Sequence, residues 1–273
     1  MELFVFLCSL IIFVSFAMMP LARRAGAPFL LIALLIGMLL GEDGPGRIQF
    51  SNFDFAFDLG SVALAVILFA GGLETGRSVF RSAGPPASLL ATIGVLITGG
   101  ITGIAACFLM DVPWQVGLLL GATVASTDAA ATFLLVQQSG IGLRQRLKDT
   151  LLLESGLNDP MAIFLTVSLT TLVASMQTNA PVDLGGMALF LLMQASIGIV
   201  GGILGGRVLA KILDQLSLPL GTYPIMTLAG ALVIFTGVSL LGGSGFLAAY
   251  LAGISLKARL KRPIDRIVDL QLG

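Results

Sequence analysis

The chain has 273 residues, of which 56% are hydrophobic and only 11% are charged. A soluble domain carries about 25% charged residues, so a mean hydropathy of +1.01 excludes an ordinary water-exposed globular surface. Fifteen basic residues balance fifteen acidic residues, and histidine is absent from the sequence. The neutral balance gives no indication of a nucleic-acid partner, and any response to pH has to come from carboxylates.

Apolar runs long enough to cross a bilayer, about 20 residues each, follow one another along the chain. The first run has Glu2 as its only early charge, so we predict a retained span and not a cleaved signal peptide. The fold class is expected to be all-α, a polytopic membrane protein with about nine transmembrane helices. The predicted spans are residues 3–19, 27–41, 57–74, 86–110, 114–138, 150–175, 187–211, 222–241 and 244–257.

Basic residues alternate between the ends of these spans. Cytoplasmic loops of membrane proteins are enriched in Lys and Arg, so the alternation predicts an N-terminus outside and a cytoplasmic last cluster. The opposite ends of the spans hold a single basic residue, Arg47. The predicted cytoplasmic residues are Arg23, Arg24, Arg77, Arg81, Arg144, Arg146, Lys148, Arg207, Lys211, Lys257, Arg259, Lys261, Arg262 and Arg266.

Two acidic residues lie deep inside predicted spans, where an Asp costs about 2.5–3.5 kcal/mol and is usually functional. Asp128 precedes Gln138, the end of the fifth span, by ten residues, and Asp159 follows Asp149, near the start of the sixth, by ten. The two spans run antiparallel from one loop. At about 1.5 Å per residue, both carboxylates are expected at the same depth, near the midplane.

Oxygen-bearing side chains accompany both carboxylates. Ser126 and Thr127 precede the first, Asn158 adjoins the second, and Ser155 lies four residues before it on the same helical face. Hard cations bind through oxygen, and Pro160 frees a backbone carbonyl one turn back, as in the discontinuous helices of secondary transporters. We predict an ion- and proton-binding site, with a broken helix, formed by Asp159, Asp128, Thr127, Ser155 and Asn158.

Other interpretations of the acidic residues stay open. A buried Asp also occurs as a simple hydrogen-bond partner of a neighbouring helix. Glu154 lies about 7 Å inside the cytoplasmic end, as a structural ion-pair partner whose opposite charge is not evident in the sequence. Glu74 ends the third span, and it either lines a cytoplasmic vestibule or is a solvated helix end paired with Arg77.

Two motifs carry a family resemblance: Ser126-Thr127-Asp128 with the following alanines, and Glu154-Ser-Gly-Leu-Asn158-Asp159-Pro160. They resemble the signature motifs of the cation:proton antiporters, in the branch of NhaP-type sodium- or potassium-proton exchangers, and most of all the bacterial potassium/proton antiporters. The resemblance extends to residues 67–73 and 243–250 and covers essentially the whole chain.

The resemblance implies an inverted-repeat fold of about thirteen helices, a homodimer and an elevator motion of the core. Residues 1–273 then form part of a sodium/hydrogen exchanger transmembrane domain. The first repeat covers about residues 1–175, a linker helix about 187–211, and the start of the second repeat about 222–257.

Residue roles follow from the same resemblance. The position of Asp159 alternately binds the cation and the proton, and those of Thr127, Asp128 and Ser155 help form the site or hold the unwound helix. The pair Asn158-Asp159 is typical of electroneutral members. Two departures stand out: Ala70 occupies a position that usually carries an acid, and the rest of the second repeat, with a basic partner for Glu154, is expected beyond residue 273.

The sequence therefore predicts a monovalent cation:proton antiporter that exchanges K⁺, Na⁺ or both for H⁺ in a bacterial inner membrane. Burial disfavours the charged form of a carboxylate, so proton and cation compete for Asp159. The alternatives are a transport-inactive membrane fragment with a structural role, and a carrier for another small solute on the same fold. No enzyme, cofactor or resident metal is indicated, because nucleophile, phosphate-loop and metal-ligand motifs are absent from the sequence.

Overall fold

The computed structural model describes residues 2–18, 20, 29–49, 51–75, 77–127, 132, 142–178, 184–216 and 219–259. Its regular elements within these ranges are all helical, as predicted. The chain separates into two units, residues 1–59 with 128–143, and residues 60–127 with 144–273.

The first unit contains α1 (Glu2–Ala17) and α3 (Phe29–Leu40), which contact each other. A tight turn follows α3. In this turn the backbone amides of Gly46 and Ile48 donate hydrogen bonds to the backbone carbonyls of Leu39 and Leu40, respectively. The side chain of Asn52 then accepts a hydrogen bond from the Phe55 amide at 3.0 Å, which caps the start of the next helix.

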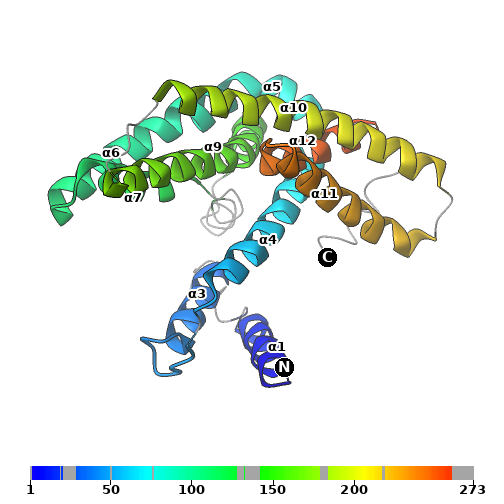
Figure 1. Cartoon of the computed structure of the whole chain (residues 1–273). Coiled ribbons are helices and arrows are strands. Elements are labelled where there is room, and N and C mark those ends of the chain that lie inside the picture. The colour runs from blue at the N-terminus through cyan, green and yellow to red at the C-terminus, as the bar shows by residue number, and fades with distance from the viewer. Residues whose placement is uncertain are drawn as a thin grey trace. The chain divides into compact units, whose positions relative to one another are not determined.

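The second unit consists of long helices that pack side by side (Figure 1). Five helical stretches among the described residues are long and apolar enough to cross a membrane, with shorter apolar helices at 31–40 and 245–257. The count of nine spans stays a prediction. The helices are α4 (Phe53–Glu74), of which residues 60–74 belong to this unit, and then α5 (Arg77–Leu89), α6 (Val95–Met110), α7 (Trp114–Thr123), α9 (Gln145–Thr178), α10 (Leu184–Gln215), α11 (Tyr223–Leu240) and α12 (Gly245–Lys257), with short turns at Leu90–Gly94 and Leu220–Thr222.

The span predicted at 86–110 begins earlier in the structure. Helix α5 starts at Arg77 and joins α6 through a π-helical turn at Leu90–Gly94. Pro85 and Pro86 lie inside α5. Each proline lacks an amide hydrogen and leaves a carbonyl of the preceding turn without its donor. The π-helical turn follows directly, as one of the rare single π-turns that occur inside α-helices.

Small residues allow the helices to approach closely. Gly198, Gly202 and Gly206 of α10 recur every four residues, and a Cβ at each would meet atoms of Ser244, Ala248 or Ala252 on α12. In a membrane the hydrophobic effect does not drive helices together, so such close packing supplies much of the association energy. This spacing of small residues therefore marks a helix contact.

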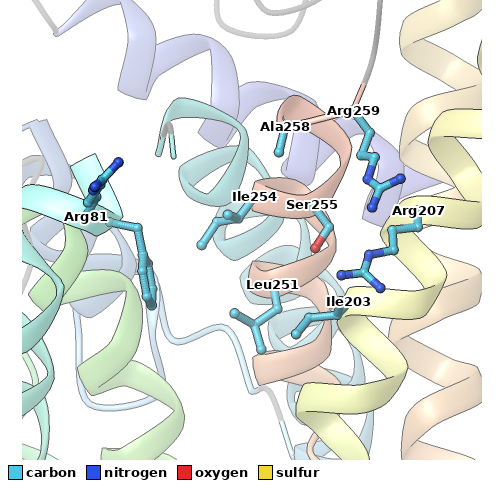
Figure 2. A pocket seen from close by; sticks show the side chains of 9 residues that line it. Arg81, Ile203, Arg207, Leu251, Ile254, Ser255, Ala258 and Arg259 are labelled. Atoms are coloured by element: carbon cyan, nitrogen blue, oxygen red, sulfur yellow. The ribbon is translucent and has the colours of Figure 1, made fainter. Parts of the chain in front are cut away.

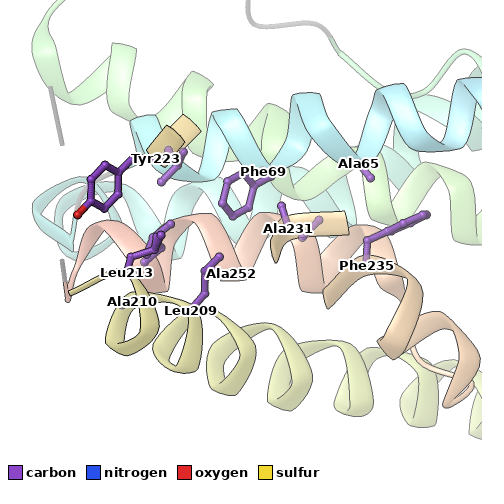
Figure 3. Packing of buried hydrophobic residues seen from close by; sticks show 12 residues of the cluster. Ala65, Phe69, Leu209, Ala210, Leu213, Tyr223, Ala231, Phe235 and Ala252 are labelled. Atoms are coloured by element: carbon purple, nitrogen blue, oxygen red, sulfur yellow. The ribbon is translucent and has the colours of Figure 1, made fainter. Parts of the chain in front are cut away.

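A buried apolar cluster lies where α4, α10, α11 and α12 meet (Figure 3). Phe69 of α4, Leu213 of α10 and Leu256 of α12 are each 1% exposed. At the end of α4, the Lys257 ammonium donates a 2.7 Å hydrogen bond to the Glu74 carbonyl. A cation at a helix C-terminus also interacts favourably with the helix dipole.

Replacement of Gly202 by alanine tests the α10–α12 contact. The new Cβ would lie 2.6 Å from the Ala248 carbonyl oxygen, so we expect a destabilisation of about 1–3 kcal/mol from overpacking. Thermal unfolding in detergent measures it. The matched control is Gly237→Ala in α11, where a Cβ meets nothing within 4 Å. Equal melting temperatures for the two variants would show that this crossing contributes little.

Candidate functional site

The fifth predicted span is interrupted in the structure. Helix α7 ends at Thr123, and residues 124–127 have no regular secondary structure. Within this segment the Ala125 amide reaches only the Ala122 carbonyl, at 3.3 Å. Backbone groups inside a membrane need hydrogen-bond partners from the protein itself. The break predicted at Pro160 is not found, because α9 (Gln145–Thr178) is continuous through that residue. An irregular segment instead follows α7 in the fifth predicted span, and it needs partners from a neighbouring element.

Helix α9 supplies these partners from one of its faces. Glu154, Ser155, Asn158 and Asp159 follow the spacing i, i+1, i+4 and i+5, which groups side chains on one side of a helix. The Ser155 hydroxyl donates a 2.8 Å hydrogen bond to the backbone carbonyl of Thr127. A side chain of α9 thus replaces a helical partner that the unwound segment lacks.

The Asp159 carboxylate accepts a hydrogen bond from Ser126 of the unwound segment. The Ser126 hydroxyl lies 2.5 Å from Asp159 Oδ1 and 3.1 Å from Asn158 Oδ1. A hydroxyl has a single proton to donate, so it serves one of these oxygens at a time. The carboxylate, the hydroxyl and the amide carbonyl place three oxygen atoms together, a set of ligands suited to a hard cation.

Glu154 accepts a second set of hydrogen bonds. The Thr127 hydroxyl donates to its carboxylate at 3.0 and 3.2 Å, and Asn158 Nδ2 donates to it at 2.9 Å. Asn158 Nδ2 also donates to Thr127 Oγ1 at 2.6 Å. Asn158 is fully buried at 0% exposed, and Glu154 is 9% exposed. Three side chains therefore close a hydrogen-bonded ring that fixes the Asn158 amide.

The ring gives the predicted site residues distinct places. Thr127 bonds Glu154 and Asn158, whereas the hydroxyl that reaches Asp159 belongs to Ser126. The sequence analysis placed Ser126 only beside Asp128. An irregular segment has no fixed side-chain period, so the spacing could not tell which of the two hydroxyls faces α9.

The predictions for the other acidic residues and for the helix that carries Pro160 have different outcomes. Asp128 lies outside the described residues, so its equal depth with Asp159 stays a prediction.

The helix carrying Pro160 is continuous, and it begins at Gln145 instead of near residue 150. The Glu74 side chain is exposed, and the backbone carbonyl of Glu74 accepts a hydrogen bond from Lys257. A cytoplasmic vestibule lined by Glu74 stays a prediction. The predicted pairing with Arg77 lies outside the described part of the chain, because the Arg77 side chain is not among the described atoms. Glu154 has neutral hydrogen-bond donors where a cationic partner was predicted, and that pairing also stays a prediction.

Tyr250 of α12 supports α9 next to the site, a role that the sequence analysis did not assign. It is 1% exposed, and a Cβ on Gly156 would collide with its ring. Its hydroxyl lies 3.3 Å from the Thr75 hydroxyl, which donates to the Gly71 carbonyl. The absence of a side chain at Gly156 thus allows the aromatic ring to pack directly against the polar helix.

An all-helical chain with several membrane-length helices and a polar cluster at an interrupted helix defines a multi-pass membrane protein. The comparisons with known proteins give its family. Residues 10–266 match the family described as sodium/hydrogen exchanger, transmembrane. The chain belongs to this family.

The curated relatives include the K(+)/H(+) antiporter NhaP2 of Shewanella sp. (strain ANA-3), 44% identical over 260 residues, which cover 95% of this chain and 45% of the relative. The K(+)/H(+) antiporter NhaP of Alkalimonas amylolytica is 44% identical over 233 residues, covering 85% of this chain and 40% of the relative. The chain thus spans less than half the length of these relatives.

A solved structure shares the fold. The sodium proton antiporter MjNhaP1 of Methanocaldococcus jannaschii superposes with a TM-score of 0.80 at 25% identity, covering 99% of this chain and 66% of that one. The prediction of an antiporter-type helical fold is confirmed by this match.

The ring around Glu154 can be tested with a matched pair of variants. Thr127→Val removes the hydroxyl that donates to Glu154 and accepts from Asn158, whereas Thr127→Ser keeps it. We expect the valine variant to lose about 1–2 kcal/mol of stability, because a buried amide hydrogen and a carboxylate lose a partner. Thermal unfolding in detergent compares them. A serine variant as unstable as the valine variant would contradict a role for the hydroxyl.

Proposed function

We propose that this chain takes part in the exchange of a monovalent cation, K⁺ or Na⁺, for protons across a membrane, with Asp159 as the shared binding group. The observation that carries the proposal is the bond of the Asp159 carboxylate to Ser126 at an interrupted helix. Membership of the sodium/hydrogen exchanger family supports it, as do the names of relatives as potassium/proton and sodium proton antiporters.

Competition for one carboxylate couples the two fluxes. Ionised Asp159 offers oxygen ligands together with Ser126 and the Asn158 carbonyl, and either a bound cation or a bound proton neutralises it. A neutral site meets a much smaller penalty in a low-dielectric surrounding than an empty, charged one. The loaded states can therefore change their exposure between the two membrane faces, and the empty state is hindered.

Asn158 contributes by orientation. Both hydrogens of its amide nitrogen are used by Thr127 and Glu154, so its carbonyl oxygen is held toward Ser126. Asp128, Thr127 and Ser155 complete the proposed site. The first is proposed as a further ligand, and the other two hold the unwound segment through the bonds described above.

The setting of the exchange is also proposed. The alternation of basic residues supports an N-terminus outside, and the bacterial sources of the relatives support a bacterial inner membrane as the location. Family likeness supports a homodimer in a lipid bilayer and an internal repeat, with the first repeat at about residues 1–175, a linker helix at 187–211 and the start of the second repeat at 222–257. The Asn158-Asp159 pair favours electroneutral exchange.

Replacement of Asp159 by asparagine is the direct test. The amide keeps the size of the side chain but can neither ionise nor exchange a proton, so we expect cation-dependent proton flux to fall to the level of empty proteoliposomes. A pH-sensitive dye inside the vesicles reports the flux after addition of K⁺, Na⁺ or Li⁺.

The matched control is Asp111→Asn, the same chemical change at an exposed position after α6. Its backbone is left-handed, with φ 50°, and asparagine tolerates that conformation. Normal flux in the control with none in the Asp159 variant supports the proposal. Exchange that persists without Asp159, or an unmodified chain that exchanges nothing, contradicts it.

A second variant addresses the ligand role of Ser126. Ser126→Ala removes one oxygen and leaves Asp159 ionisable, so we expect the KM for the cation to rise about tenfold, equivalent to about 1.4 kcal/mol, while flux at saturating cation is retained. Ser239→Ala serves as the control, since that hydroxyl bonds only the Phe235 carbonyl of its own helix. An unchanged KM would remove Ser126 from the cation site.

A further inference from the structure

A hollow in the second unit lies apart from the Asp159 site. It has a volume of about 830 Å³ and lies between α5, α10 and α12 (Figure 2). Its walls are mostly apolar, with Phe80, Ile203, Leu251 and Ile254 among them. An apolar hollow of this size accommodates a hydrocarbon chain or a similar apolar group.

Three arginines line the same hollow: Arg81 from α5, Arg207 from α10, and Arg259 just after α12. In Figure 2 the Arg207 and Arg259 side chains approach each other beside Ser255. Like charges at such a position repel unless an anion lies between them. The part of the chain that the structure describes provides no hydrogen bond or ion pair to any of these three guanidinium groups.

The charge continues into a neighbouring hollow of about 520 Å³. Arg207 and Arg259 line it as well, together with Lys211 and Asp214. Taken together, the two hollows are lined by four cationic side chains and a single described carboxylate. Asp214 already has a partner elsewhere in the chain, so the positive excess is large.

We propose that this basic hollow, lined by Arg81, Arg207 and Arg259, binds a phosphate group, and that the phosphate belongs to the headgroup of an anionic phospholipid. Guanidinium groups match phosphate oxygens with paired hydrogen bonds. The apolar walls beside them suit an acyl chain, which inorganic phosphate does not have.

The position of the arginines along the chain agrees with a membrane surface. All three belong to the basic clusters that the sequence predicts on the cytoplasmic side. The cytoplasmic leaflet carries the anionic lipids of a cell membrane, and basic groups near it gain affinity from them. A lipid bound here, with its phosphate at Arg207 and Arg259 and its acyl chain along the apolar wall, would contact α5, which packs on α9, as well as the α10–α12 pair. It would thus stabilise the arrangement around the helix that carries Asp159.

Lipid binding by the purified chain tests the proposal independently of transport. Native mass spectrometry counts retained lipid after incubation with phosphatidylglycerol or phosphatidylcholine, and thermal unfolding measures the stabilisation by each. We expect selective retention of phosphatidylglycerol. The double variant Arg207→Gln/Arg259→Gln should bind it at least about tenfold more weakly, because two charge-assisted contacts are lost.

The matched control is the double variant Arg144→Gln/Arg146→Gln, which removes the same charge at exposed positions before and at the start of α9. Retention of phosphatidylglycerol by this control supports the proposal, and equal loss in both double variants overturns it, as does equal binding of phosphatidylcholine. A third arm adds millimolar inorganic phosphate: if phosphate alone displaces the lipid and stabilises the protein equally well, the ligand is free phosphate and the lipid assignment is wrong.

Discussion

The structure depends on one constraint, the need to satisfy an unwound backbone segment between membrane helices. Residues 124–127 leave α7 without the hydrogen bonds of a helix, and in lipid such groups find no water to replace them. Helix α9 meets the need with the Ser155 bond to the Thr127 carbonyl and the Glu154–Thr127–Asn158 ring. Because these bonds come from one helical face, α9 has to be held in a fixed rotation about its axis.

Small residues hold α9 in this fixed rotation, because they let neighbouring helices pack closely. Gly156 allows the Tyr250 ring to lie against α9, and Gly72 and Gly253 allow α4 and α12 to approach backbone to backbone. The buried hydroxyl pair of Tyr250 and Thr75 then ties α12 to the end of α4. Lipid-facing apolar residues cannot supply this order, since lipid competes equally well for them. The abundance of glycine is thus a condition for a polar site, because it locks the helices that carry the ligands.

The sequence predicts much of this arrangement. Hydropathy locates the helices to within a few residues in most cases, and the helical period places Ser155 and Asp159 on one face. What it could not provide depends on tertiary packing. Pro160 does not interrupt α9, since the loss of one backbone bond is tolerated where neighbouring helices support the turn. Arg81, Arg207 and Arg259 are far apart in the sequence but line one hollow. The alternation of basic residues predicts only that they lie on the same side of the membrane, and not that they line a common hollow.

The two carboxylates of α9 differ in what surrounds them, and this difference decides where a cation and a proton would compete. Glu154 receives two hydrogen-bond donors, the Thr127 hydroxyl and the Asn158 amide nitrogen. A cation there would face hydrogens that point at the same oxygens. Asp159 instead contacts the Ser126 hydroxyl, which also reaches the Asn158 carbonyl oxygen. The fixed amide therefore separates a carboxylate that holds the unwound segment through Thr127 from one that is hydrogen-bonded to Ser126, and Glu154 has no charged partner among the described side chains.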